Sequence, residues 1–457
     1  MELNNIQSLY FLGAGGIGMS ALIRYFLSNG KRVAGYDLTP SELTAQLNKE
    51  GAKIHYEDNI TLIPDYCTRP ETTLVVYTPA VPTTLGEFRY FQEKGFSIVK
   101  RAELLGIITR QSRALCVAGT HGKTTTSSML AHLLKQSTVD CNAFLGGILK
   151  NYGSNLMLSQ KSDLTVIEAD EFDRSFHHLS PYMAIITSVA PDHLDIYETE
   201  AAYRESFRHF ASLIHPEGTL LLRKGIKLDI SQSIRLFTYS ASEGGDFHAE
   251  KIRYENGKLL FDFIGPNVEL KEVELGLPIP INVENAVAAM AVAYLNGVKE
   301  DELRTGMKTF AGPRRRFDFI LRTETITLID DYAHHPEELK ASIQSVRALY
   351  NKSKLTVVFQ PHLYTRTRDF AKDFAESLSL ADELILLDIY PAREKPIEGV
   401  DAHLIFDQVT IANKQLTSKE ELLSLMEKGE YEVVLMVGAG DIDRLVTPVK
   451  ELLKKQQ

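Results

Sequence analysis

The sequence predicts an α/β protein of three domains, and three observations support this fold class. The chain has 457 residues, which at about 150 residues per domain corresponds to about three domains. Short apolar runs, several of them apolar on both faces, alternate with amphipathic helical segments along the chain, as in proteins built on buried parallel strands. Three glycine-rich turns, each between a predicted strand and a predicted helix, divide the chain further.

The predicted strands recur from the first residues to the last. They are Ser8–Leu12, Thr73–Tyr77, Ala114–Ala118, Leu164–Glu168, Ala184–Ser188, Lys354–Phe359, Glu383–Leu387 and Glu432–Val437. The stretch Asp246–Leu277 differs, because short alternating segments flank Asn256-Gly257, a strong hairpin signal. It predicts a small antiparallel excursion within the middle domain.

Domain boundaries are placed near residues 110 and 317. The basic segment Gly312–Arg316, which contains proline and glycine, precedes a new predicted strand, Thr325–Asp330. The predicted domains are therefore residues 1–110, 111–317 and 318–457.

Composition excludes several classes of protein. With 50 basic and 60 acidic residues, the net charge is -10, which argues against a general binder of nucleic acid or anionic membranes. Three cysteines are too few for a disulfide framework and suit a reducing cytoplasm. No apolar run approaches the ~18 residues of a membrane span, and Met1–Asn5 has no basic region typical of a signal peptide. We expect a cytoplasmic protein.

The first glycine-rich turn, Gly13–Gly18, matches G-x-G-x-x-G and opens a predicted helix, Met19–Leu27. Glycines at such a turn let the backbone approach a pyrophosphate at a helix N-terminus. Asp37 lies 19 residues after Gly18, where a ribose-binding acid usually stands. The pattern predicts a Rossmann-like domain with a nucleotide-diphosphate ligand, NAD being one candidate. A tight turn without a ligand is the alternative.

The second turn, Gly119–Thr126, follows a buried strand and precedes a helix from about Thr125 to Lys135. It is a shortened phosphate loop, because Val117 stands where the full motif requires glycine. Backbone N–H groups of such a loop wrap a phosphate, Lys123 contacts its β/γ oxygens, and the Thr124 hydroxyl can bind Mg²⁺. The alternative is a capped helix start that happens to carry a lysine.

Acidic and imidazole side chains stand where a phosphate loop needs them. Glu168 ends a predicted strand, and His193, in Asp192–Asp195, follows another. Together with Thr124 they could hold Mg²⁺ by oxygen and nitrogen ligands. His177 and His178 are adjacent on a segment expected to be extended, so they should point apart as surface or polar-cleft residues.

The third polar region, Asp330–Glu338, follows a predicted strand, as does His362 with Arg366 close behind it. Carboxyl ends of parallel strands meet at one edge of a sheet, so these groups should converge on one crevice. Arginine there would bind a carboxylate through two hydrogen bonds. An ordinary helix cap with surface charges is the alternative.

Taken together, these segments resemble those of the Mur ligases, ATP-dependent enzymes that form amide bonds in bacterial cell-wall synthesis. The resemblance runs nearly end to end and includes Phe310–Phe317, which looks like the end of the family's central domain. It implies an N-terminal Rossmann-like UDP-sugar-binding domain, a central P-loop ATPase-like domain, and a C-terminal Rossmann-like domain that binds the amino acid.

The resemblance also implies roles for individual residues. Lys123, Arg316 and His334 would be catalytic. The ATP site would comprise Gly119, Thr120, His121, Gly122, Lys123, Thr124, Thr125, Asn282, Asn285, Arg316 and Asp331. The UDP-sugar site would comprise Gly13, Gly15, Gly16, Ile17, Gly18 and Asp37. The amino acid would meet Tyr332, His334, His362 and Arg366, and the metal would be bound by Thr124, Glu168 and His193.

Three positions depart from the family pattern. Ile281 stands where a histidine usually precedes the asparagine pair, which removes one adenine contact. Leu363 stands where arginine often follows the histidine, which leaves Arg366 as the clearer carboxylate anchor. Glu57 stands near where a histidine often helps hold the UDP end.

The implied reaction joins the lactyl carboxylate of UDP-N-acetylmuramate to L-alanine through an acyl phosphate, with ATP as co-substrate and Mg²⁺ as cofactor. A ligase that instead adds a murein tripeptide shares the motifs and remains an alternative. An NAD-dependent oxidoreductase would leave Gly119–Thr126 unexplained, and Lys123 with Glu168 argues against a non-catalytic nucleotide-binding regulator. We expect a monomer or weak homodimer acting on small molecules, with no nucleic-acid or membrane partner.

Overall fold

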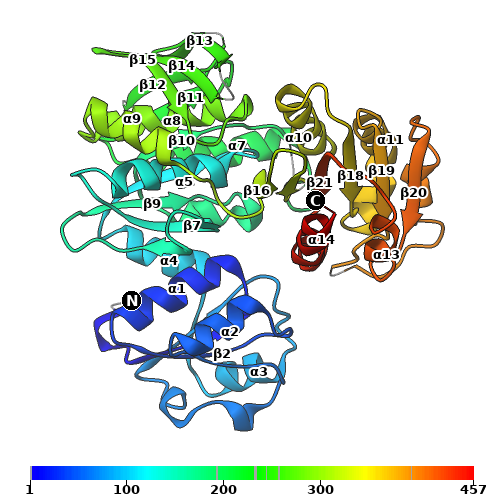
Figure 1. Cartoon of the computed structure of the whole chain (residues 1–457). Helices are drawn as coiled ribbons and strands as arrows, with labels where there is room; N and C mark the ends of the chain where they lie inside the picture. Colours follow the sequence, from blue (N-terminus) through cyan, green and yellow to red (C-terminus); the bar gives the residue numbers. More distant parts are fainter. Residues whose placement is uncertain are drawn as a thin grey trace. The chain divides into compact units, whose positions relative to one another are not determined.

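The computed structural model describes residues 3–191, 194–230, 234–242, 244–255, 258–392 and 394–456. The chain divides into two compact units (Figure 1). The first unit comprises residues 1–278 and 282–311, and the second comprises residues 279–281 and 312–457. Three β-sheets, two in the first unit and one in the second, carry the α/β architecture.

The first sheet has five parallel strands in the order β3-β2-β1-β4-β5. Its central strand β1 is buried along its whole length, as a parallel strand covered on both faces should be. The strands are β1 (Ser8–Leu12), β2 (Arg32–Tyr36), β3 (Lys53–His55), β4 (Thr73–Tyr77) and β5 (Ser97–Lys100), and the helices are α1 (Ile17–Ser28), α2 (Glu42–Lys49), α3 (Gly86–Glu93) and α4 (Arg101–Thr109).

The second sheet is mixed, in the order β15-β14-β13-β12-β11-β10-β6-β9-β7-β8. The predicted antiparallel excursion is confirmed, because β13 (Phe247–Glu255), β14 (Lys258–Gly265) and β15 (Val268–Leu275) pair antiparallel. The turn residues Asn256 and Gly257 lie outside the described residues. The other strands are β6 (Arg113–Ala118), β7 (Asn142–Leu149), β8 (Ser154–Met157), β9 (Leu164–Glu168), β10 (Pro181–Ile186), β11 (Thr219–Arg223) and β12 (Arg235–Ser240).

The helices of this part of the chain include α5, which opens at the phosphate loop. They are α5 (Lys123–Lys135), α6 (Leu194–Tyr197), α7 (Glu200–Ser212), α8 (Ile281–Leu295) and α9 (Glu300–Thr309), with the 3₁₀ segment η4 (Phe172–His178) after β9.

The third sheet, in the second unit, has the order β16-β17-β21-β18-β19-β20, and β16 alone runs antiparallel to its neighbour. Its strands are β16 (Asp318–Arg322), β17 (Thr327–Asp331), β18 (Leu355–Phe359), β19 (Glu383–Leu387), β20 (Asn413–Thr417) and β21 (Val433–Val437), and its helices are α10 (Pro336–Leu349), α11 (Tyr364–Leu378), α12 (His403–Phe406), α13 (Leu422–Met426) and α14 (Asp443–Lys455).

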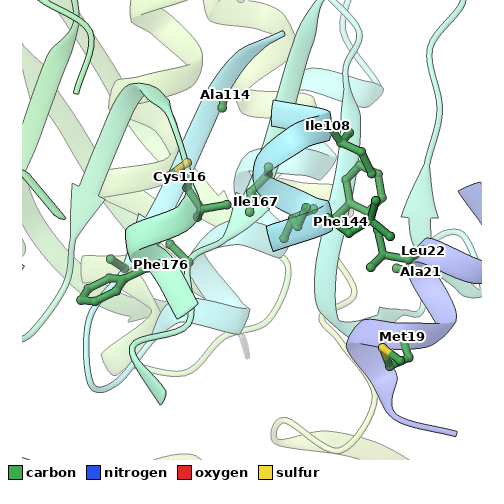
Figure 2. Close-up of a cluster of buried hydrophobic side chains, with 14 of the residues drawn as sticks. Met19, Ala21, Leu22, Ile108, Ala114, Cys116, Phe144, Ile167 and Phe176 are labelled. Carbon is green, nitrogen blue, oxygen red and sulfur yellow. The ribbon is translucent and has the colours of Figure 1, made fainter. Parts of the chain in front are cut away.

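One buried apolar cluster joins the first two sheets within the first unit. This cluster includes Met19, Ala21 and Leu22 of α1 together with Phe144 of β7 (Figure 2). A polar link accompanies this packing, since Asn155 Nδ2 donates to the carbonyl of Ile17 at 2.7 Å. The start of α1 is therefore held against the second sheet.

Two local predictions were wrong. Strand β10 ends at Ile186 rather than Ser188, because Thr187 turns to bond the phosphate loop through its hydroxyl. His177 and His178 lie in the 3₁₀ segment η4 rather than on an extended one, because Phe176 is buried in the core and His177 stacks on it at 4.8 Å.

The predicted domain boundaries near 110 and 317 remain predictions; they fall between α4 and β6 and just before β16. Cys67, Cys116 and Cys141 are free and buried. Within the described part of the chain, no helix has the length and apolar character that a bilayer crossing needs.

Candidate functional site

The phosphate loop turns sharply between β6 and α5. Gly119 has a φ of +136°, and a Cβ there would lie 2.1 Å from Thr187 Oγ1, so only glycine fits. Thr187 Oγ1 donates to the carbonyl of His121 at 2.5 Å, and Thr120 Oγ1 donates to that of Ala190 at 2.6 Å. The loop is thus held by hydrogen bonds to the segment that follows β10. Its N–H groups lie at the start of α5.

Lys123 of this loop is largely buried against an acid that the sequence did not single out. Its Nζ lies 2.7 Å from Glu171 Oε2 and 2.7 Å from the carbonyl of Gly119. Burial alone would lower the pKa of Lys123, but the carboxylates of Glu171, Asp170 and Glu168 raise it. The ammonium is therefore charged and paired with Glu171.

The predicted metal-binding acid lies directly beside the loop. Thr124 Oγ1 donates to Glu168 Oε1 at 3.0 Å, and the Gly146 N–H donates to Oε2 at 3.1 Å. Hydroxyl and carboxylate oxygens are ligands that Mg²⁺ prefers. His193, the third predicted ligand, lies outside the described residues. Among the residues that are described, no three histidine, cysteine or acidic side chains gather to hold a metal by themselves.

The asparagine pair lies on α8 beside the same loop. Thr126 Oγ1 donates to Asn285 Oδ1 at 3.1 Å, and Asn285 Nδ2 donates to Asn282 Oδ1 at 3.2 Å. A Cβ on Gly122 would lie 2.8 Å from Asn285 Oδ1. The structure therefore brings together the described first-unit residues that were predicted to bind ATP.

Asp37, predicted to bind ribose, contacts the first glycine loop itself. Its Oδ2 accepts from the Gly15 N–H at 2.6 Å, and its Oδ1 accepts from the Thr39 N–H at 3.1 Å. The carboxylate thereby holds the loop in shape, and a ribose contact stays a prediction.

A cavity of about 230 Å³ lies between the first glycine loop and Glu168, the acid predicted to bind metal. Its lining includes Gly16, Ile17 and Gly18 at the start of α1, and the acidic residues Glu168 and Asp170. Arg101, at the first position of α4, also lines it. A ligand that fills the cavity would extend from the predicted UDP loop to the carboxylate at the phosphate loop.

In the second unit, the predicted amino-acid residues form a cluster of rings. The ring of His334 lies 5.3 Å from that of Tyr332 and 5.9 Å from that of His362. His334 Nδ1 lies 2.9 Å from the carbonyl of Tyr332, which can only accept, so Nδ1 carries the proton and Nε2 is an acceptor. Burial lowers the pKa of His334, with Glu338 opposing and Arg366 reinforcing the shift.

Arg316 and Asp331 adjoin this cluster. The guanidinium carbon of Arg316 lies 5.2 Å from the centre of the Tyr332 ring. Asp331 Oδ1 accepts from the N–H groups of Phe317 and Tyr332 at 3.2 and 2.9 Å. Burial raises the pKa of Asp331, which Ser342 and Arg316 oppose. The second unit therefore joins its predicted ATP-contacting and amino-acid-contacting residues.

In the third glycine-rich turn, Gly438–Asp441, the side chain of Gln360 forms the hydrogen bonds. Gln360 Nε2 donates to Asp441 Oδ1 at 2.9 Å, and the Ile442 N–H donates to Gln360 Oε1 at 3.0 Å. The turn at the end of β21 is therefore braced by Gln360, the residue that follows β18.

Sequence patterns did not identify Glu171, Arg101 or Gly146 as parts of the site. Glu171 was visible as an acid just after a strand, but its partner Lys123 is 48 residues away. Gly146 carries no motif, although a Cβ there would lie 2.4 Å from both carboxylate oxygens of Glu168.

Comparisons with known proteins agree along the whole chain. Residues 8–113 match the family described as "Mur ligase family, catalytic domain", residues 117–293 the "Mur ligase middle domain", and residues 315–440 the "Mur ligase, glutamate ligase domain". The chain is 66% identical over 458 residues to the UDP-N-acetylmuramate--L-alanine ligase of Parabacteroides distasonis, covering 100% of this chain and 99% of that protein. It is 58% identical to the protein of the same name from Phocaeicola vulgatus, covering 100% of both.

A solved structure is similar in fold over the same length. The UDP-N-acetylmuramate-alanine ligase of Thermotoga maritima matches with a TM-score of 0.84 at 27% identity, covering 98% of this chain and 100% of that one. From the three matched domains and these relatives, the chain belongs to the Mur ligase family.

Proposed function

We propose that the chain is an ATP-dependent ligase that joins the lactyl carboxylate of UDP-N-acetylmuramate to L-alanine, in the synthesis of peptidoglycan precursors. Relatives of that name over the full length support the substrates. The observation that carries the proposal is the cavity that extends from the first glycine loop to Glu168, beside the phosphate loop. Such a cavity suits a sugar nucleotide whose far end must reach the γ-phosphate of ATP.

The chemistry requires activation of the carboxylate, whose oxygen is a poor leaving group. Transfer of the γ-phosphoryl group from ATP gives an acyl phosphate and ADP; the amine then attacks the acyl carbon, and phosphate leaves. Carboxylate and triphosphate repel each other, so positive groups must offset the charge that develops. Lys123, whose ammonium donates to the Gly119 carbonyl of the phosphate loop, is proposed for this role, and Arg316 is proposed to assist. Correct positioning supplies much of the remaining acceleration.

Mg²⁺ is the proposed cofactor, and the residues present fit it. Thr124 and Glu168 offer a hydroxyl and a carboxylate within hydrogen-bonding distance of each other, and His193 is the proposed third ligand. When bound, the ion would neutralise phosphate charge and polarise the transferred group.

The incoming amine is assigned to the second unit. Tyr332, His362 and Arg366 would hold the amino acid, with Arg366 on its carboxylate. His334 is neutral at pH 7 and has Nε2 free of a proton, which suits it to accept a proton from the amine. Because the amine and the acyl phosphate must meet, the reaction requires groups from both units.

We propose that each of the three predicted domains binds one of the substrates. Residues 1–110 would bind the UDP-sugar, residues 111–317 ATP, and residues 318–457 the amino acid. The substrates are small molecules, and the proposed location is the cytoplasm, with the chain acting as a monomer or weak homodimer.

Phosphate release from ATP tests the proposal. The protein is given ATP, Mg²⁺ and UDP-N-acetylmuramate with L-alanine, glycine, L-serine or the murein tripeptide in turn. Release that is fastest with L-alanine, and absent without the sugar nucleotide, is expected. Release with tripeptide alone would make the chain a recycling ligase. Tight NADH binding without any phosphate release would point to an oxidoreductase.

A further inference from the structure

Helix α4 contributes a basic residue to the cavity that the glycine motif does not imply. Arg101 is the first residue of α4, and the N-cap Lys100 is fixed by its N–H donating to Glu103 Oε2 at 2.8 Å. Of the described residues that line the cavity, Arg101 is the one with a basic side chain. The start of α4 is therefore capped, and its first residue brings a permanent positive charge to the cavity.

The guanidinium of Arg101 lies against the start of α1. A Cβ on Gly18 would be 2.8 Å from Arg101 Nη1 and 3.2 Å from its Cδ. No side chain caps α1, and the first intrahelical bond runs from the Ser20 N–H to the carbonyl of Gly16. The N–H groups of Ile17, Gly18 and Met19 thus have no acceptor within the helix. A guanidinium and a helix N-terminus adjoin each other here.

The side chain's existing ion pair is weak. Arg101 Nη2 lies 3.5 Å from Asp170 Oδ2, and the two side chains are 21% and 39% exposed. At that distance and exposure the contact contributes little to stability. Most of the donors of the guanidinium therefore remain available to a ligand in the cavity.

We infer that Arg101 binds the pyrophosphate of the sugar nucleotide, together with the N–H groups at the start of α1. Both features attract anions, and a pyrophosphate offers several oxygens to a forked donor. The carboxylates of Glu168 and Asp170 also line the cavity, and Asp170 lies beside Arg101. The groups in the cavity that attract an anion are therefore the Arg101 guanidinium and the N–H groups at the start of α1. This inference rests on the proposed function for the identity of the ligand.

Binding measurements on the full chain, without ATP, test the inference. The probes are uridine, UDP, UDP-N-acetylglucosamine and UDP-N-acetylmuramate, and the variants are Arg101→Ala and Arg101→Lys. The matched control is Arg110→Ala, which removes an exposed arginine from the far end of the same helix. Arg101→Ala should weaken the binding of all three diphosphates by at least about 10-fold, leave the binding of uridine unchanged, and leave the melting temperature within about 2 °C. Arg101→Lys should restore part of the loss, and Arg110→Ala should change nothing.

The other outcomes overturn the inference in distinguishable ways. Unchanged UDP affinity in Arg101→Ala, with a loss for UDP-N-acetylmuramate alone, would assign Arg101 to the lactyl carboxylate instead. Unchanged affinity for every probe, while the native protein still releases phosphate with L-alanine, would remove Arg101 from the site and leave the proposed function standing. A native protein that binds no uridine nucleotide would end both.

In steady-state assays, Arg101→Ala should raise KM for UDP-N-acetylmuramate and leave KM for ATP and for L-alanine unchanged. A structural defect would not separate the three constants in this way.

Discussion

Two side chains of opposite charge, the buried Glu171 and the largely buried Lys123, meet at the phosphate loop at 2.7 Å. Burial raises the pKa of Glu171, and the ammonium of Lys123 opposes that shift. A buried pair of this kind contributes little net stability when intact, but removing one partner leaves an uncompensated charge. Glu171 therefore holds Lys123 in place when no phosphate is bound.

Lys123→Met should lower the rate of phosphate release by at least ~100-fold, because the ammonium stabilises the phosphoryl transition state. It should also lower the melting temperature, since Glu171 loses its buried partner. The double variant Lys123→Met/Glu171→Gln should recover the melting temperature but not the activity. Calorimetry and the phosphate assay measure the two effects separately. Activity in either variant close to the native value would remove Lys123 from the mechanism.

Gly146 determines where the Glu168 carboxylate lies. A Cβ there would be 2.4 Å from both carboxylate oxygens, so Gly146→Ala must push the end of a flexible side chain aside. Folding should be little affected, but the Thr124–Glu168 arrangement proposed for Mg²⁺ should be lost. We expect the Mg²⁺ concentration for half-maximal activity to rise several-fold while the melting temperature stays within about 2 °C. An unchanged Mg²⁺ requirement would mean that Glu168 does not bind the ion.

At the scale of elements, one buried carboxyl group connects helix α3, strand β1 and the loop at Asn59. Glu87, at the start of α3, accepts from Tyr10 Oη of β1 at 2.6 Å and from the Asn59 N–H at 3.2 Å. His55, at the end of β3, lies 2.7 Å from Tyr10 Oη through its Nε2. Glu87 is fully buried, and burial raises its pKa to about 7, against the hydrogen bonds from Tyr10 and Asn59.

This carboxyl group should make the first unit less stable as the pH rises. The folded protein retains the proton of Glu87 up to about pH 7, whereas the unfolded chain loses it near its ordinary value of 4.5. The stabilisation is therefore complete below pH 4.5 and is lost as the pH rises through 7. Between pH 5 and pH 8, the loss should be about 2–3 kcal/mol.

Glu87→Gln removes this titration and keeps the shape of the side chain. The difference in free energy of unfolding between the variant and the native protein, measured in urea at each pH, should grow in the variant's favour from pH 5 to pH 8. Taking differences cancels groups that do not contact Glu87, such as His132, whose pKa burial lowers to about 4 and which acts in the opposite direction. A difference independent of pH would show that Glu87 is ionised throughout.

The sequence predicted the elements well where a strand is buried on both faces. Ser8–Leu12, Thr73–Tyr77, Leu164–Glu168 and Glu383–Leu387 have the predicted bounds, because continuous apolar runs end where the chain leaves the core. The antiparallel pair β7–β8 was not predicted. Strand β7 also pairs in parallel with β9, the next strand after β8, and a sequence pattern does not fix that order in the sheet.

For the site, glycine and lysine motifs located the loops, because the backbone geometry of a phosphate turn constrains neighbouring residues. Contacts between elements did not follow from the sequence. The partners of Lys123 and Asp37, and the approach of Arg101 to Gly18, depend on how strands and helices are ordered in space. Motif spacing carries no information on that order.

At the scale of the molecule, the division into two units should be visible in ligand binding. The cavity and the first glycine loop lie wholly in the first unit. UDP should therefore stabilise that unit and leave the second unchanged, because a ligand stabilises only what it binds. At 100 times its dissociation constant UDP contributes about 2.7 kcal/mol, which should raise the transition of the first unit by about 5 °C.

Scanning calorimetry at a fixed scan rate measures this effect, and core variants identify the transitions. Val434→Ala opens a cavity in the buried cluster of the second unit and should lower only that unit's transition. Glu87→Gln should raise only the first at pH 8. With the two transitions assigned, UDP should shift the first alone, while uridine, which lacks the pyrophosphate, should shift it far less. A shift of both transitions by UDP would mean that the sugar nucleotide is not confined to the first unit. A single transition in every variant would mean that the two units unfold as one.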